Sequence, residues 1–317
     1  MKLISGTSNI PLAQEIAKEL EMELTPCTIK RFADGEIYAH IDENVRGENI
    51  FIIQALGPPI NDNIMELLIL LDAAKRASAG KITCVIPYYG YGRQDRKVRA
   101  REPISAKLVA NLLTTAGAQS ILTVDLHANQ IQGYFDIPVD DIWAASTLAS
   151  YFQELKISDL VVVSPDAGGV ARARYFGKKL DAPIALIDKR RETHNESEVM
   201  HVVGDIEGKN AIIIDDIIDT AGTITKACAA IKKRGAKAVY LVATHGLFNG
   251  NAYVNIENSN AEEVVVTNTL TLPESAPSKI RVISIGPLVA MAIKHSYEGG
   301  SLSTLLERKF AAKTVKR

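Results

Sequence analysis

Short runs of apolar, β-branched residues recur along the whole chain, and longer segments with helical periodicity separate many of them. Continuous apolar runs indicate buried strands, whereas apolar residues at every third or fourth position indicate amphipathic helices. Because parallel strands need a crossover connection, the alternation predicts an α/β fold of mostly parallel sheets flanked by helices. The predicted strands are 49–55, 82–87, 120–125, 160–165, 184–188, 211–216 and 238–244, and the predicted helices are 64–79, 104–116, 170–180 and 223–234.

The same unit of strand, polar loop and helix appears in both halves of the chain, which predicts two similar α/β domains. We expect these domains to cover residues 1–145 and 146–317, because a helix is expected to begin within 144–150 after the loop-like stretch 135–146. Several basic residues lie near the C-terminus, and we expect the last two dozen residues to form a solvated tail. They are Arg308, Lys309, Lys313, Lys316 and Arg317.

Composition excludes several classes of protein. The chain has 317 residues, 47% of them hydrophobic, and 36 basic residues against 37 acidic ones, so a disordered chain and a general nucleic-acid binder are both disfavoured. Its three cysteines are far apart, which argues against a disulfide framework or a zinc site. No apolar run approaches 18 residues, so we expect no membrane segment and a soluble, cytoplasmic protein.

The densest candidate chemistry lies in residues 211–223, AIIIDDIIDTAGT. Ligands of open α/β sheets bind at the carboxyl ends of strands, and Asp215 and Asp216 follow a buried strand at such an end. The turn Asp219–Thr223 then opens a helix, whose N-terminus attracts anions. A sugar phosphate would suit both parts: the acids would bind its hydroxyls or a cation, and the turn would bind its phosphate. The alternative is that the turn is only an ordinary helix cap.

This string resembles the phosphoribosyl-diphosphate binding motif of type I phosphoribosyltransferases, and further strings narrow the resemblance. Nearly the whole chain is similar to the ribose-phosphate diphosphokinase family. That family transfers the β,γ-diphosphoryl group of ATP to the C1 hydroxyl of ribose 5-phosphate and requires magnesium, and its fold implies two phosphoribosyltransferase-like domains. The strings are RFADGE at 31–36, PYYGYGRQDR at 87–96, VDLHANQIQGYFDIPVD at 124–140, SPDAGG at 164–169 and DKRR at 188–191.

The resemblance implies roles for individual residues. Asp215 and Asp216 are expected to bind the ribose hydroxyls and an associated cation, and the turn is expected to bind the 5-phosphate. Metal ligands are expected to be His127 and Asp166, although a lone histidine after a strand is more often structural and magnesium prefers oxygen. The residues implied in 5-phosphate binding are Asp219, Thr220, Ala221, Gly222 and Thr223.

For ATP, the resemblance implies contacts from Arg93 and Gln94, and a loop that reaches the adenine of a neighbouring subunit's site. That loop contains Phe32, Asp34, Gly35 and Glu36. Without the resemblance, the same loop reads as a plain Asp-Gly turn between two strands. The basic run 93–101 also has an alternative interpretation as a nucleic-acid patch, but phosphates of ATP and effectors account for it with fewer assumptions.

Diphosphoryl transfer needs cations placed on the oxygens that gain charge as the α,β bridge breaks. We assign Lys189 and Arg191 to this role, and Arg191 is also expected to bind ribose 5-phosphate. Residues 191–201 are expected to form a loop that closes over ATP. An exposed cationic turn is the alternative. Glu192–His194 departs from the commoner family pattern, in which prolines and further basic residues follow.

The family is usually a homohexamer that phosphate activates and ADP inhibits, which implies the same for this chain. Arg46, Arg101, Ser301 and Ser303 occupy positions similar to the effector site, although Asn44 replaces a common serine.

Three other functions compete with this one. An ordinary kinase lacks support because the chain has no GxxxxGK[ST] loop. A phosphoribosyltransferase shares the 215–223 loop but has no need of a second α/β half. A catalytically silent relative of the synthetase is disfavoured because the charged residues of the expected site are all in place.

Overall fold

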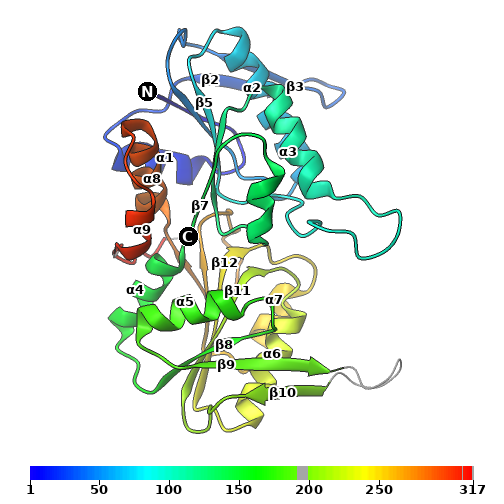
Figure 1. Cartoon of the computed structure of the whole chain (residues 1–317), viewed down its shortest axis with the longest axis vertical. Helices are drawn as coiled ribbons and strands as arrows, with labels where there is room; N and C mark the ends of the chain where they lie inside the picture. Colours follow the sequence, from blue (N-terminus) through cyan, green and yellow to red (C-terminus); the bar gives the residue numbers. More distant parts are fainter. Residues whose placement is uncertain (191–198, 309, 316–317) are drawn as a thin grey trace. The chain divides into compact units, whose positions relative to one another are not determined.

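The computed structural model describes residues 1–190, 199–308 and 310–315 and forms two compact units (Figure 1). Unit 1 comprises Met1–Trp143, Thr269–Thr271 and Ile285–Arg308, and unit 2 comprises Ala144–Asn268, Leu272–Ser284 and Lys309–Arg317. The division into domains 1–145 and 146–317 stays a prediction. The structure groups two later segments of the chain with the first unit. No helix within the described ranges has the length and apolar character needed to cross a membrane.

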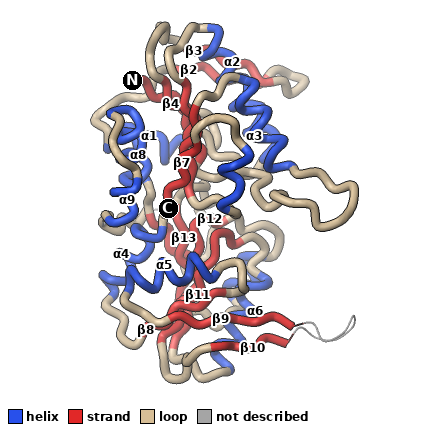
Figure 2. Tube along the Cα trace, viewed as in Figure 1, coloured by secondary structure: helices blue, strands red, loops and turns tan. Residues whose placement is uncertain are grey.

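Unit 1 contains a five-stranded, wholly parallel sheet with strand order β1-β4-β5-β6-β7. Helices α1 and α8 pack together on one face, and α2 and α3 cover the other (Figure 2). All five residues of β5 and of β6 are buried, as expected for strands covered on both faces. The strands are β1 (Lys2–Ser5), β4 (Ile50–Ile53), β5 (Ile82–Ile86), β6 (Ser120–Val124) and β7 (Val139–Ile142). The helices are α1 (Ile10–Glu19), α2 (Ile60–Arg76), α3 (Ser105–Ala116), the 3₁₀ helix η1 (Asn129–Tyr134), α8 (Gly286–Glu298) and α9 (Ser303–Glu307).

A separate antiparallel hairpin in unit 1 joins β2 (Cys27–Arg31) to β3 (Ile37–Ile41). Its β3 strand packs on helix α2. The hairpin turn therefore lies on the α2 side of the unit.

Unit 2 contains a seven-stranded sheet with order β10-β9-β8-β11-β12-β13-β14, in which only β10 is antiparallel to its neighbour. Helices α4 and α5 pack together, while α6 packs on β11 and β12 beside α7. The strands are β8 (Leu160–Ser164), β9 (Ile184–Arg190), β10 (Val199–Val203), β11 (Asn210–Ile218), β12 (Ala238–Gly246), β13 (Glu263–Thr267) and β14 (Ile280–Ile283). The helices are α4 (Ala145–Leu155), α5 (Val170–Leu180), α6 (Gly222–Lys233) and α7 (Ala252–Glu257).

The structure confirms the α/β fold of mostly parallel sheets flanked by helices. Helix α5 has the predicted bounds, whereas α2 begins four residues before the predicted 64–79 and ends three residues earlier. Residues 135–146 are not wholly a loop, because β7 forms within them and pairs with β6.

The prediction of a solvated C-terminal tail is wrong in part, because residues 310–315 pack along β14 although Ala311, Lys313 and Thr314 stay exposed. Phe310 is buried, and Ser284 N–H donates to the carbonyl of Lys313 at 2.8 Å. Val315 N–H likewise donates to Val282 at 2.9 Å. The open edge of β14 provides these partners, and the buried ring adds apolar contact, so the basic residues do not keep the segment in solvent.

Candidate active site

The order of strands in unit 2 creates a switch point between β8 and β11. From β8 the chain continues through α5 to β9 on one side, and from β11 it continues through α6 to β12 on the other. The two strands are parallel and paired up to Val163 and Ile213, so the loops that follow them diverge from neighbouring points. Ligands of open α/β sheets bind in such a crevice. Asp166 and Asp216 each lie three residues beyond that last pair.

Asp215 and Asp216 lie near the carboxyl end of β11 and share a cation. The guanidinium Nη1 of Arg172, in the first turn of α5, lies 3.3 Å from Asp216 Oδ1 and 3.8 Å from Asp215 Oδ1. The Asp216 side chain is nearly buried, and those of Arg172 and Asp215 are 20% and 31% exposed. Arg172 therefore offsets charge that would otherwise be uncompensated at the end of the strand. Sequence analysis did not identify it.

The two carboxylates perturb one another. Burial, the charge of Asp216 and a hydrogen bond with Asp216 raise the pKa of Asp215 from 3.8 to about 8, and the attraction of Arg172 acts in the opposite direction. A raised pKa of this kind is typical of paired acids in a site that binds a further positive charge or a hydroxyl group.

The turn that follows β11 is held by two asparagines outside the predicted motif. Asn249 Nδ2 donates to Asp219 Oδ1 at 2.8 Å, and Asn255 Nδ2 donates to the carbonyl of Thr220 at 2.9 Å. Ala221 adopts the left-handed conformation with φ of 60°, a strained state for a non-glycine residue. These contacts fix the turn before α6. Because no described side chain caps that helix, the backbone N–H groups of its first turn are available to an anion.

Asp166 lies in the β8–α5 loop and is exposed. Its Oδ1 accepts a hydrogen bond from Gly169 N–H at 3.0 Å, while Ser164 Oγ donates to its carbonyl at 2.6 Å. The loop therefore presents one carboxylate at the start of α5, in the same unit as the Asp215–Asp216 pair. Unit 2 thus brings together Asp166, the two acids and the turn 219–223.

In unit 1, Arg93, Gln94 and His127 follow the neighbouring strands β5 and β6. A Cβ atom built on Gly92 would lie 3.6 Å from the Cβ of His127, so the two loops are in contact. All three residues are exposed. Ser105 Oγ donates a short hydrogen bond to Gln94 Oε1. Asp95, which sequence analysis left without a role, joins the loops.

The Asp95 contacts extend beyond its own loop. Gln130 Nε2 donates to its Oδ2 at 2.6 Å, and Tyr134 Oη donates to its carbonyl. Both partners lie in η1, directly after His127. The structure therefore brings the predicted nucleotide loop and one predicted metal ligand together in unit 1.

Residues 32–36 form the turn of the β2–β3 hairpin, which is also what the alternative interpretation predicted. Phe32 N–H donates to the carbonyl of Glu36, and Glu36 N–H donates to Asp34 Oδ1. Gly35 has φ of 94°, a conformation that strains other residues. The Phe32 ring is 57% exposed, so the turn presents an aromatic face and carboxylates to its surroundings.

A cavity of about 200 Å³ in unit 1 lies beside Ser303, one of the residues predicted at an effector site. Ser301 and Ser303 share a hydrogen bond of 2.7 Å between their hydroxyls. The pKa of Asp140, which also lines the cavity, is raised by burial. Its lining combines polar groups with Trp143, Leu288 and Leu305.

Lys189 lies at the end of β9 and pairs with Met200 of β10, but its side chain is outside the described part of the structure. Arg191 lies outside the described residues. Within the described ranges, no three His, Cys, Asp or Glu side chains gather as a metal cluster.

Comparison with known proteins covers nearly the whole chain. Residues 1–117 match the N-terminal domain of ribose phosphate pyrophosphokinase, and residues 191–307 match the phosphoribosyl synthetase-associated domain. Ribose-phosphate pyrophosphokinase of Bacillus caldolyticus is 53% identical over 308 residues, which cover 97% of this chain and 98% of that protein. The protein of the same name from Corynebacterium ammoniagenes is 53% identical over 306 residues, with 96% of both chains covered. The crystal structure of phosphoribosylpyrophosphate synthetase from Mycobacterium smegmatis matches with a TM-score of 0.89 and 45% identity, covering 94% of this chain and 99% of that one.

Proposed function

The chain belongs to the ribose-phosphate pyrophosphokinase, or diphosphokinase, family, and from this premise we propose which of its residues bind each substrate and the metal ion. The enzyme transfers the diphosphoryl group of ATP to the C1 hydroxyl of ribose 5-phosphate for nucleotide biosynthesis. The products are 5-phospho-α-D-ribose 1-diphosphate and AMP.

Ribose 5-phosphate binds in unit 2 at the switch point between β8 and β11. Asp215 and Asp216 accept hydrogen bonds from the ribose hydroxyls, and the turn Asp219–Thr223 donates backbone N–H groups to the 5-phosphate. Strand β11 bears the two paired acids near its carboxyl end, and the helix that follows it, α6, begins without a side-chain cap. This succession is the observation that carries the assignment. Arg191 adds a further cation for the same substrate.

ATP is bound by the two loops of unit 1 that meet at Gly92 and His127, with Arg93 and Gln94 on the nucleotide. Phe32, Asp34, Gly35 and Glu36 contact the adenine of a neighbouring subunit's site, where the exposed ring stacks and a carboxylate accepts from the amino group. A solvent-facing ring on a firmly built turn supports this assignment. The active enzyme is then at least a dimer, and we infer a homohexamer.

Magnesium fits the residues present. Mg²⁺ is typically held by one or two carboxylates while water and substrate phosphates complete its shell. Asp166 presents an exposed carboxylate, and His127 presents an imidazole in a loop next to Arg93. When bound, the ion neutralises charge on the phosphate oxygens. The protein residues orient the nucleotide and the sugar in line and exclude water.

Lys189 and Arg191 stabilise the oxygens that gain negative charge as the bond between the α- and β-phosphates breaks. The oxygen of the ribose C1 hydroxyl attacks the β-phosphorus and gives up its proton, and the electron pair of the broken bond between the α- and β-phosphates leaves with AMP. The β9 strand supports this role because it carries Lys189 out at the carboxyl edge of the sheet, beside β8.

Phosphate and ADP act as effectors at Arg46, Arg101, Ser301 and Ser303. The chemistry of these side chains supports this assignment, because two guanidinium groups and the neighbouring hydroxyls of Ser301 and Ser303 are donors that suit phosphate oxygens. The reaction uses cytosolic metabolites, and we place the enzyme in the cytoplasm.

One assay tests the function. AMP formation from ATP and magnesium is measured with and without ribose 5-phosphate, across a range of phosphate concentrations, and the sugar product is identified. Sugar-dependent AMP together with phosphoribosyl diphosphate is the expected result. An absence of AMP under all conditions would identify a silent relative, and diphosphate release from phosphoribosyl diphosphate and a nucleobase would identify a transferase.

A further inference from the structure

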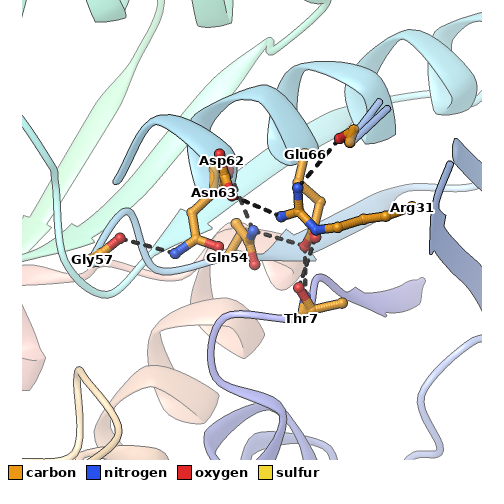
Figure 3. Close-up of polar contacts among 8 residues, drawn as sticks. Thr7, Arg31, Gln54, Gly57, Asp62, Asn63 and Glu66 are labelled. Atoms are coloured by element: carbon orange, nitrogen blue, oxygen red, sulfur yellow. Dashed lines mark hydrogen bonds and ion pairs between the residues drawn. The ribbon is translucent and has the colours of Figure 1, made fainter. Parts of the chain in front are cut away.

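A buried network anchors helix α2 to the sheet of unit 1. Glu66, only 2% exposed, accepts hydrogen bonds from Thr7 N–H at 2.6 Å, Thr7 Oγ1 at 2.7 Å and Gln54 Nε2 at 2.8 Å (Figure 3). Thr7 follows β1 and Gln54 follows β4. Because a buried carboxylate is costly unless its hydrogen bonds are made, this network holds α2 firmly against the ends of two strands.

The first turn of the anchored helix holds two loops. Tyr91 Oη, two residues before Arg93, donates to Asn61 Oδ1 at 2.7 Å. Arg31 Nη2, at the base of the hairpin turn, lies 3.1 Å from Asp62 Oδ2. Figure 3 draws this ion pair as a dashed line. Arg31 Nη1 also donates to the carbonyl of Gly35, at 3.5 Å, inside that turn.

These contacts are placed where they add little to stability. The Arg31 and Asp62 side chains are 47% and 49% exposed, and exposed ion pairs contribute about 0–1 kcal/mol. The hydrogen bond between Tyr91 and Asn61 is exposed as well. Both contacts do, however, limit the orientations available to a loop that is assigned to ATP.

We propose that Asn61 and Asp62 are positioning residues for ATP, which hold the nucleotide loop 91–94 and the hairpin turn 32–36 in fixed orientations on one helical turn. This inference rests on the proposed function, which assigns both loops to ATP. In that function the two loops serve the enzyme's own ATP site and a neighbour's site, so each α2 helix links two sites.

The test compares Asp62→Asn with Asp72→Asn. Asp72 lies on the same helix, is about as exposed as Asp62 and forms an ion pair with Arg76 away from both loops, so it controls for loss of a surface charge. Asp62→Asn is expected to raise the KM for ATP about threefold to fivefold, the upper part of the range for one exposed ion pair. The turnover number, the KM for ribose 5-phosphate and the midpoint temperature of unfolding should match those of Asp72→Asn. Asp62→Glu, which keeps the carboxylate, should restore the KM for ATP to within twofold of the wild type.

A second variant separates this inference from the proposed function. Phe32→Ala should raise the KM for ATP about tenfold or more, and Asp62→Asn should then add less than it does in the wild type, since part of the contact that Asp62 positions is already lost. An unchanged KM in Phe32→Ala would overturn the assignment of the turn to ATP. If Phe32→Ala raises the KM but Asp62→Asn behaves as Asp72→Asn does, the positioning role alone is wrong.

Discussion

Replacing Asp215 with asparagine is expected to stabilise the protein at alkaline pH while it removes most of the activity. The folded state holds the pKa of this carboxyl at about 8 instead of 3.8. A raised carboxyl pKa makes a contribution to stability that is fully present below the unfolded pKa and is lost as pH rises through the folded one. Above pH 8, where both Asp215 and Asp216 are ionised, the free energy of unfolding is therefore lowered by the full effect of the second negative charge.

The magnitude follows from the difference between the two pKa values. At 1.36 kcal/mol per pKa unit the ceiling is about 6 kcal/mol. The side chain is 31% exposed, Asp216 shares the repulsion, and asparagine gives up the attraction of Arg172. These effects reduce the expected gain to about 2 kcal/mol at pH 8.5, which raises the midpoint of unfolding by about 4–8 °C for a unit of this size. At pH 5 the gain falls below about 1 kcal/mol.

Scanning calorimetry of the full chain, with EDTA and without substrates, measures the midpoint at pH 8.5 and pH 5. Asp181→Asn is the control, because Asp181 is an exposed acid at the C-terminus of α5 in the same unit and its replacement should change little. A midpoint that falls in Asp215→Asn at pH 8.5, or that rises equally at both pH values, would refute the electrostatic origin of the effect.

Three further predictions concern individual residues of the site. Lys189→Ala should reduce turnover by orders of magnitude with little change in ATP affinity, measured by AMP formation and calorimetric titration with a non-hydrolysable ATP analogue; unchanged turnover contradicts its role. Arg172→Met should lower the free energy of unfolding by about 2–3 kcal/mol at pH 8.5 and by less at pH 5, where a proton replaces the lost cation, and a pH-independent loss contradicts the pairing. His127→Ala should raise the magnesium concentration needed for half-maximal activity about tenfold while leaving ribose 5-phosphate binding intact, and an unaltered magnesium requirement would argue for a structural histidine.

The sequence predicted the features that depend on local pattern. Continuous apolar runs identified β5, β6 and β8, because a strand covered on both faces has no polar side. The periodicity of 170–180 gave the bounds of α5. The motif at 215–223 was placed correctly near the carboxyl end of a buried strand, although β11 continues to Ile218, two residues beyond the predicted 211–216.

Features that depend on distant partners escaped prediction. Arg172 lies in a polar stretch and gains its role only because β8 pairs with β11, which places it beside acids more than 40 residues away. Strand β7 contains Asp140 and Asp141, residues that disfavour strands, and it forms because β6 offers an open edge. Asp141 Oδ1 also accepts from Leu126 N–H, a partner that no local pattern indicates.

The grouping of residues 285–308 with unit 1 has a consequence for biosynthesis. Helix α8 packs on α1, and Gly286 approaches Glu15 so closely that an added Cβ would meet its carboxyl carbon at 2.6 Å. A nascent chain leaves the ribosome from its N-terminus, so the face of α1 that α8 covers waits until nearly the whole protein has been translated. Unit 1, although its synthesis begins first, is therefore not completed until residues 285–308 have been translated, and a chain truncated before residue 285 leaves that face of α1 uncovered.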